Sequence, residues 1–126
     1  MKQEDKLLLL KDLSARLPYG VICRFEDTIR ITDGNPDPYY EYKLSERHIG
    51  FFRNNKDFYI KPYLRQMSSM TEEERDWYYN FIDRKFYYES ASELVDWLNS
   101  HNFDYRGLIP KGLAIEVTKD NNPYKN

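Results

Sequence analysis

The chain has 126 residues, of which 40% are hydrophobic and 32% charged, with a formal net charge of −2 at pH 7. This length fits one domain over residues 1–126, and a single cysteine excludes an internal disulfide framework and a cysteine-built zinc site. No apolar run is long enough to span a membrane and the N-terminus lacks a signal-peptide pattern, so we expect a cytoplasmic protein.

Leucines at helical spacing predict an N-terminal helix. The stripe consists of Leu7, Leu10, Leu13 and Leu17, and Leu8 and Leu9 widen its apolar surface. Pro18 and Gly20 should stop the helix. The stripe lacks the repeated heptads of a coiled coil, so we expect this helix to pack on its own domain. The sequence leaves a homodimer open.

Residues 20–62 predict an antiparallel meander of four or five strands. Apolar and polar residues alternate over 21–26 and again over 29–31, with a turn expected at Glu26–Asp27 between them. Glycine, asparagine and two prolines make residues 33–38 a loop. Connections this short join antiparallel neighbours.

The third strand of this meander places Tyr40 and Tyr42 on one face, opposite their neighbours in the chain. Two short runs, 49–52 and 58–61, predict a hairpin around a pair of asparagines. Pro62 should end its second strand, because proline cannot donate a backbone hydrogen bond.

The last third of the chain is predicted to be helical. Capping boxes at 71–74 and 90–93 should open two helices, joined by a short extended segment at 86–88. Residues 113–117 alternate as a short closing strand, and the tail should fray from about Lys119. The side chains expected to face inward are Trp77, Tyr78, Phe81 and Ile82 in the first helix and Leu94, Trp97, Leu98 and His101 in the second.

Together these elements predict an α+β fold. The N-terminal helix is followed by the meander, and the two C-terminal helices pack against one face of the sheet. A small curled, barrel-like sheet is the alternative, because short twisted strands can close on themselves.

No pattern indicates catalysis or a cofactor. His48 and His101 are far apart without a second ligand at metal-site spacing, and Cys23 falls on an inward strand position where a thiol acts as a small hydrophobe. The carboxylates of residues 72–74 are explained by a helix start, and a phosphate-binding glycine loop is missing. We therefore expect a protein that is not an enzyme and takes neither metal nor cofactor.

Two stretches that join helices to the sheet combine cations with aromatic rings, which favours a surface that binds an unidentified protein. The structural alternative is that Tyr63, Phe103 and Tyr105 plug the ends of the core and that the arginines bridge carboxylates such as Asp104. The candidate interface residues are Tyr63 and Arg65 in residues 61–70, and Tyr105 and Arg106 in residues 102–112.

A second hypothesis is that the sheet binds single-stranded nucleic acid by stacking bases on its aromatic residues. It requires a locally positive face. Duplex nucleic acid is disfavoured as a partner because charge is spread, with no basic patch. The candidate stacking residues are Tyr40, Tyr42, Phe58 and Tyr59.

Three segments resemble recurrent segments of short uncharacterised proteins encoded in gut Bacteroidales genomes and their phages or prophages. They are KPYLRQMSSMTEEE at Lys61–Glu74, WLNSHNFDYRGLIPKGLAIE at Trp97–Glu116 and EDKLLLLKDLSARLPYGV at Glu4–Val21. The resemblance leaves out residues 24–57 and implies a cytoplasmic accessory role in a bacterium or phage. It supplies no activity, cofactor or catalytic residue.

Overall fold

A computed structural model describes residues 1–27, 39–83 and 89–125 and has an α+β fold. The described residues form four α-helices, two short 3₁₀ helices and one mixed four-stranded sheet. In chain order these are α1 (Gln3–Arg16), η1 (Leu17–Tyr19), β1 (Ile22–Asp27), β2 (Tyr39–Lys43), α3 (Glu46–Asn54), β3 (Phe58–Leu64), η2 (Met67–Ser69), α4 (Glu72–Ile82), α5 (Glu89–Ser100) and β4 (Ile115–Glu116).

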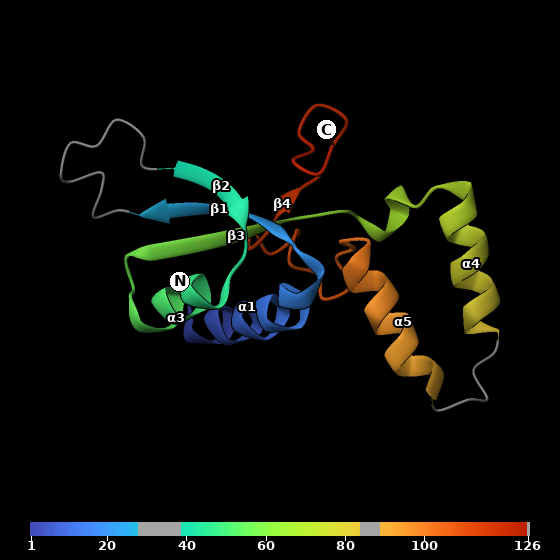
Figure 1. Cartoon of the computed structure of the whole chain (residues 1–126), viewed down its shortest axis with the longest axis horizontal. Coiled ribbons are helices and arrows are strands. Elements are labelled where there is room, and N and C mark those ends of the chain that lie inside the picture. The colour runs from blue at the N-terminus through green and yellow to red at the C-terminus, as the bar shows by residue number, and fades with distance from the viewer. Residues whose placement is uncertain (28–38, 84–88, 126) are drawn as a thin grey trace.

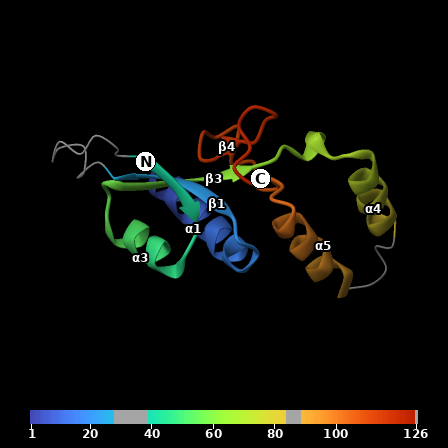
Figure 2. The same ribbon diagram turned by 45° about the horizontal axis from the view of Figure 1, so that its top comes forward.

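The sheet has the strand order β2-β1-β3-β4 and stays open. β1 pairs antiparallel with both β2 and β3, whereas β4 runs parallel to β3. α1 and α3 lie side by side under one face of the sheet (Figures 1 and 2). The predicted α+β class is confirmed. The predicted meander of four or five strands is wrong, because β1, β2 and β3 are the strands described over residues 20–62 and β1 lies between the other two. The barrel-like alternative is also wrong, because the sheet stays open.

The predicted N-terminal helix is confirmed as α1. Its buried side differs from the predicted stripe: Leu9 and Leu13, one turn apart, are fully buried in the core, whereas Leu7 is 57% exposed and Leu10 and Leu17 are partly buried. The helix passes into η1 at Leu17–Tyr19, and Gly20 then adopts a φ of 73°. Glycine takes this left-handed conformation at the end of a helix without a steric penalty.

Residues 46–54 form helix α3, so the hairpin predicted from the runs 49–52 and 58–61 is wrong. Ser45 and His48 make a reciprocal capping box that opens the helix. Ile49 and Phe52 are then buried, three positions apart on the same helical face. A short apolar run is compatible with the periodicity of a helix or of a strand. Here the capping box and the packing of the buried side chains favour the helix.

Two predicted strand ends are also wrong. β1 continues through Glu26, which pairs with Tyr39 and Tyr59, so no turn lies there. β3 continues past Pro62, which pairs with Cys23. The Leu44 amide donates to the Val21 carbonyl (2.9 Å), so Val21 and every second residue after it, including Cys23, direct their backbone groups toward β2. Cys23 therefore makes no backbone hydrogen bond to Pro62, its neighbour in β3. The missing proline N–H therefore costs no bond in this ladder. The strand predicted at 29–31 lies outside the described residues.

α4 and α5 form an arm that projects beside the sheet (Figure 1). The Thr71–Glu74 capping box is confirmed and opens α4. α5 begins at Glu89, so the box predicted at 90–93 lies inside the helix instead of opening it. The extended segment predicted at 86–88 lies outside the described residues.

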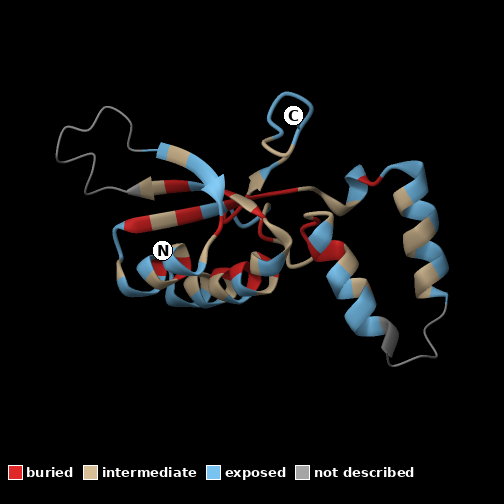
Figure 3. Cartoon of the chain, viewed as in Figure 1, coloured by how far each residue is buried: buried red, intermediate tan, exposed pale blue. Residues whose placement is uncertain are grey.

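The expectation that these two helices cover a sheet face is wrong, because α1 and α3 occupy that position. The predicted inward stripe of α4 does face α5, where Trp77 stacks on Trp97 with ring centroids 4.4 Å apart. Every residue of α4 is nevertheless half-buried or exposed (Figure 3).

The predicted closing strand exists as β4, only two residues long, beside β3. Beyond it, the Tyr124 hydroxyl donates to the Tyr63 carbonyl (2.7 Å) and accepts from the Ile22 amide (3.0 Å). This hydroxyl lies next to the end of β1–β3 pairing and replaces a strand-to-strand hydrogen bond. Burial raises the pKa of Tyr124 far above its ordinary value.

Candidate binding surface on the open face of the sheet

The face of the sheet that α1 and α3 leave uncovered carries an ordered array of tyrosine and charged side chains. Strand register places Glu26 between Tyr39 and Tyr59 in one row across the sheet. In the next row, two residues along each strand, Arg24 lies between Glu41 and Lys61. We call these six residues the open face.

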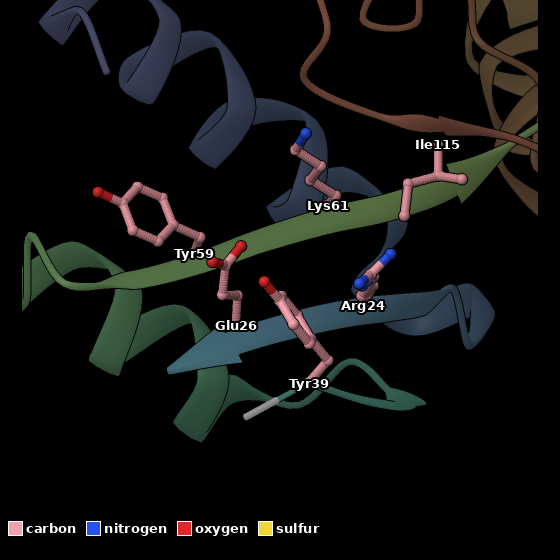
Figure 4. Close-up of a pocket in the computed structure, with 6 residues that line it drawn as sticks. All are labelled: Arg24, Glu26, Tyr39, Tyr59, Lys61 and Ile115. Carbon is pink, nitrogen blue, oxygen red and sulfur yellow. The ribbon is translucent and has the colours of Figure 1, made fainter. Parts of the chain in front are cut away.

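The open face contains a shallow hollow of about 210 Å³. Its lining side chains come from all four strands and are shown in Figure 4: Arg24, Glu26, Tyr39, Tyr59, Lys61 and Ile115. A neighbouring hollow of about 400 Å³ lies over β2 and shares Arg24 and Tyr39.

The charges of the open face are available to a partner. The Arg24 guanidinium carbon lies 4.4 Å from the centroid of the Tyr39 ring, which is a cation–π contact. Among residues 1–27, 39–83 and 89–125, no ion pair involves Arg24, Glu26 or Lys61. A partner can therefore pair with these groups without first breaking an internal ion pair.

Tyr63, a predicted interface residue, lies at the edge of this face but is only 2% exposed. Its hydroxyl donates to Glu41 (2.8 Å). Burial, together with that hydrogen bond, raises the pKa of Tyr63 to about 12. Tyr63 is therefore a buried residue that fixes the position of the Glu41 carboxylate on the open face by a hydrogen bond.

Arg65, the second predicted interface residue, joins β3 to the arm. Its guanidinium makes two hydrogen bonds with the Glu74 carboxylate (2.7 and 2.8 Å) and lies 4.3 Å from the Phe103 ring centroid. The Arg65 guanidinium lowers the pKa of Glu74 to about 2. The donor groups that would bind a partner are thus engaged inside the chain.

Tyr105 and Arg106 belong to a polar cluster beside α1. Arg106 donates to the fully buried Asp12 (2.9 Å) and to the Tyr105 hydroxyl (3.1 Å). Tyr105 in turn donates to Asn99 of α5 (2.7 Å), and Arg16 makes a buried ion pair with Asp12 (2.7 Å). The cluster holds α1, α5 and the loop after α5 together.

The arginines bridge the carboxylates of Asp12 and Glu74. Asp104, the carboxylate expected in this role, instead accepts hydrogen bonds from the backbone amides of Leu108 and Ile109 (2.9 Å each).

The four candidate stacking residues do not share a surface. Tyr40 stacks on Phe25 (5.1 Å between centroids), and Phe58 is 7% exposed in the same core. Tyr42 is 67% exposed at the outer strand, on the opposite face from Tyr59. Only Tyr59 lies on the open face.

Sequence reasoning missed Tyr39, Arg24, Glu26 and Lys61 as members of one surface. The available signal was alternation, which places Tyr39 on the face opposite Tyr40. Choosing the uncovered face required the positions of α1 and α3, and α3 was not predicted. Pairing of β1 with both neighbours then brings Tyr39 and Tyr59 into one row.

The remaining reactive residues have structural surroundings. Cys23 is buried, and burial raises the pKa of its thiol well above the ordinary range. His48 caps α3 and packs 4.0 Å from the Phe25 ring centroid; burial, with a contribution from Arg47, lowers its pKa. His101 follows α5, with Nδ1 2.9 Å from the Trp97 carbonyl oxygen.

The residues that the structure describes contain neither a metal-binding cluster nor a membrane-spanning helix. No group of three or more histidine, cysteine, aspartate or glutamate side chains is arranged to hold a metal ion. No helix there has the length and apolar character needed to cross a bilayer. Comparison with known proteins found no matching family model, no matching curated protein and no matching solved structure.

Proposed function

We propose that this chain is a non-enzymatic module that binds another protein through the open face. The observation that carries the proposal is the row Tyr39–Glu26–Tyr59 beside Arg24 and Lys61, two cations that form no ion pair with any other residue that the structure describes. Tyrosine and arginine are the side chains most enriched at protein interfaces, because they offer large contact area with a polar end.

The mixed charge of the open face supports a protein as the partner. Arg24 and Lys61 lie beside the carboxylate of Glu26, and none of the three forms an ion pair within the described part of the chain. Glu41 adds a second carboxylate, which accepts a hydrogen bond from Tyr63. A polypeptide surface can supply both signs of charge at this spacing. A polyphosphate backbone would meet repulsion from both glutamates.

Affinity capture tests the class of partner. The tagged chain is incubated with lysate of a gut Bacteroidales bacterium, with and without nuclease, and retained proteins are quantified by mass spectrometry. The proposal expects the same retained proteins in both samples. Loss of every retained protein after nuclease treatment would contradict it and favour a nucleic-acid partner.

Single-stranded nucleic acid is the second candidate. It is supported by Tyr59 and Tyr39 on one accessible face with Arg24 and Lys61 beside them, an arrangement able to combine base stacking with phosphate contact. Fluorescence anisotropy with labelled poly(dT) and poly(U) oligonucleotides at low salt tests it. Absence of binding there eliminates this candidate.

Origin and location belong to the same proposal. The resemblance of Lys61–Glu74 and Trp97–Glu116 to segments of Bacteroidales and phage proteins supports an accessory role in the cytoplasm of such a bacterium. Fractionation of cells that express the tagged chain checks this, with recovery in the soluble cytoplasmic fraction as the expected result.

A further inference from the structure

The α4–α5 arm presents an apolar surface that the rest of the described chain leaves partly uncovered. Trp77 stacks on Phe81 (5.0 Å between ring centroids) and on Trp97 of α5 (4.4 Å), so these rings join the two helices. Tyr79 is two positions from Trp77, which places it on the other side of α4, away from that contact. None of the α4 residues is buried, and Tyr79 is 60% exposed. Helices that stay this exposed on an aromatic side are typical of a docking face for another helix.

A hollow of about 430 Å³ lies at the base of the arm, where η2 meets α4. Met67, Met70, Tyr78 and Tyr79 line it, together with Ser68 and Arg75. Methionine side chains adapt to apolar groups of different shape, and the tyrosines provide flat walls. This hollow has the chemistry to receive a large apolar side chain.

The charge of the arm determines what can approach it. Residues 71–100 carry eight Asp/Glu against three Lys/Arg. Five described carboxylates of the arm are exposed and form no ion pair within the described chain: Glu72, Glu73, Asp76, Asp83 and Glu93. Asp96 is also exposed but accepts a hydrogen bond from the Tyr19 hydroxyl (2.7 Å). Arg75 is the exposed cation among residues 71–83 and 91–100.

From the apolar face and this charge we infer that the arm binds a basic amphipathic helix of a partner protein. Its apolar side would cover Tyr79 and enter the hollow, and its lysines or arginines would pair with carboxylates such as Glu72 and Asp76. The arm of a second copy would bring like charges together, and nucleic acid or an anionic membrane would be repelled in the same way. The inference uses residues outside the open face, so it stands or falls independently of the proposed function.

Tryptophan fluorescence tests the inference directly, because both tryptophans of the chain, Trp77 and Trp97, lie in the arm. The probe is a tryptophan-free amphipathic peptide of lysine and leucine, about 18 residues or roughly five helical turns long. One control peptide has the same composition in scrambled order, and the other has glutamate in place of lysine. We expect a saturable emission change with the amphipathic lysine peptide only.

Charge-removing variants locate the contact. The variant E72Q/D76N/D83N should bind the lysine peptide about tenfold more weakly, the loss expected for three surface ion pairs. The matched control E4Q/E46Q/E116Q removes three exposed carboxylates outside the arm and should bind like wild type. The apolar variant Tyr79→Ser should also weaken binding.

Three results would overturn the inference. One is the absence of any emission change with the lysine peptide, and another is an equal response to the scrambled or glutamate peptide. The third is an equal loss of affinity in the two triple variants, which would indicate general attraction to the chain instead of docking on the arm.

Discussion

Tyr124 places one hydroxyl group between two strands near the point where their pairing ends. It donates to the Tyr63 carbonyl and accepts from the Ile22 amide. Both backbone groups would otherwise need water or another partner, because an unpaired buried polar group is destabilising. The residue therefore fastens the C-terminal segment to the sheet.

Replacing Tyr124 by phenylalanine should lower the free energy of unfolding by about 1–3 kcal/mol, because the ring stays while the Ile22 amide loses its partner. Urea denaturation measures the change. Tyr42→Phe is the matched control, since Tyr42 is 67% exposed and should lose almost nothing. Equal stability of the two variants would show that the hydroxyl contributes nothing.

Glu74 should make stability depend on pH. Arg65 lowers the pKa of this carboxyl from 4.5 to about 2 in the folded chain. A lowered folded-state pKa means that the stabilisation is present above the unfolded pKa and is lost as the pH falls toward 2.

The test compares unfolding free energies of wild type and Glu74→Gln between pH 6 and pH 2.5. The difference should be largest at pH 6 and shrink as the pH falls. Glu73→Gln is the control from the same helical turn, because Glu73 is exposed and forms no ion pair with another described residue. A difference that stays constant with pH would contradict the role given to the Arg65–Glu74 pair.

At the scale of elements, local signals predicted some boundaries well and others poorly. The Thr71–Glu74 box and the stop at Gly20 act through neighbouring residues, so the sequence alone is enough to place them. Helix α3 depends on whether Phe52 packs against the sheet, which is a tertiary choice. Pro62 continues its strand because β1 leaves that position without a hydrogen bond.

The arm should open independently of the sheet. Trp77 provides the closest ring contact between α4 and α5, and α4 has no buried residue of its own. Trp77→Ala should therefore raise amide hydrogen exchange in α4 by roughly tenfold while β1 and β3 keep their protection. Equal acceleration in α4 and in the sheet would show that the arm and the sheet unfold as one unit.

At the scale of the whole molecule, the two ends of the fold present different chemistry. Arg24 and Lys61 give the open face unpaired positive charge, whereas the arm is acidic and aromatic. The residues first expected to bind a partner, such as Arg65 and Arg106, link these parts from inside. Their partners Glu74 and Asp12 are distributed along the chain, so only the assembled fold distinguishes a linking arginine from an exposed one.

The open face was unpredictable for a related reason. Tyr39 and Tyr59 are twenty positions apart in sequence and meet only because β1 pairs with both of their strands. Alternation predicts two faces for each strand and cannot say which one the helices will cover. The fold class was therefore accessible from the sequence, and the surface was not.

The most direct test of binding at the open face compares variants on the two opposite faces of the sheet in one capture experiment. Wild type, Tyr39→Ser/Tyr59→Ser and Tyr42→Ser are used to retain proteins from the same nuclease-treated lysate, after circular dichroism shows that each variant is folded. Proteins held by wild type should be lost with the double variant and kept by Tyr42→Ser, whose side chain is exposed on the other face. Retention of the same proteins by all three would contradict binding at the open face.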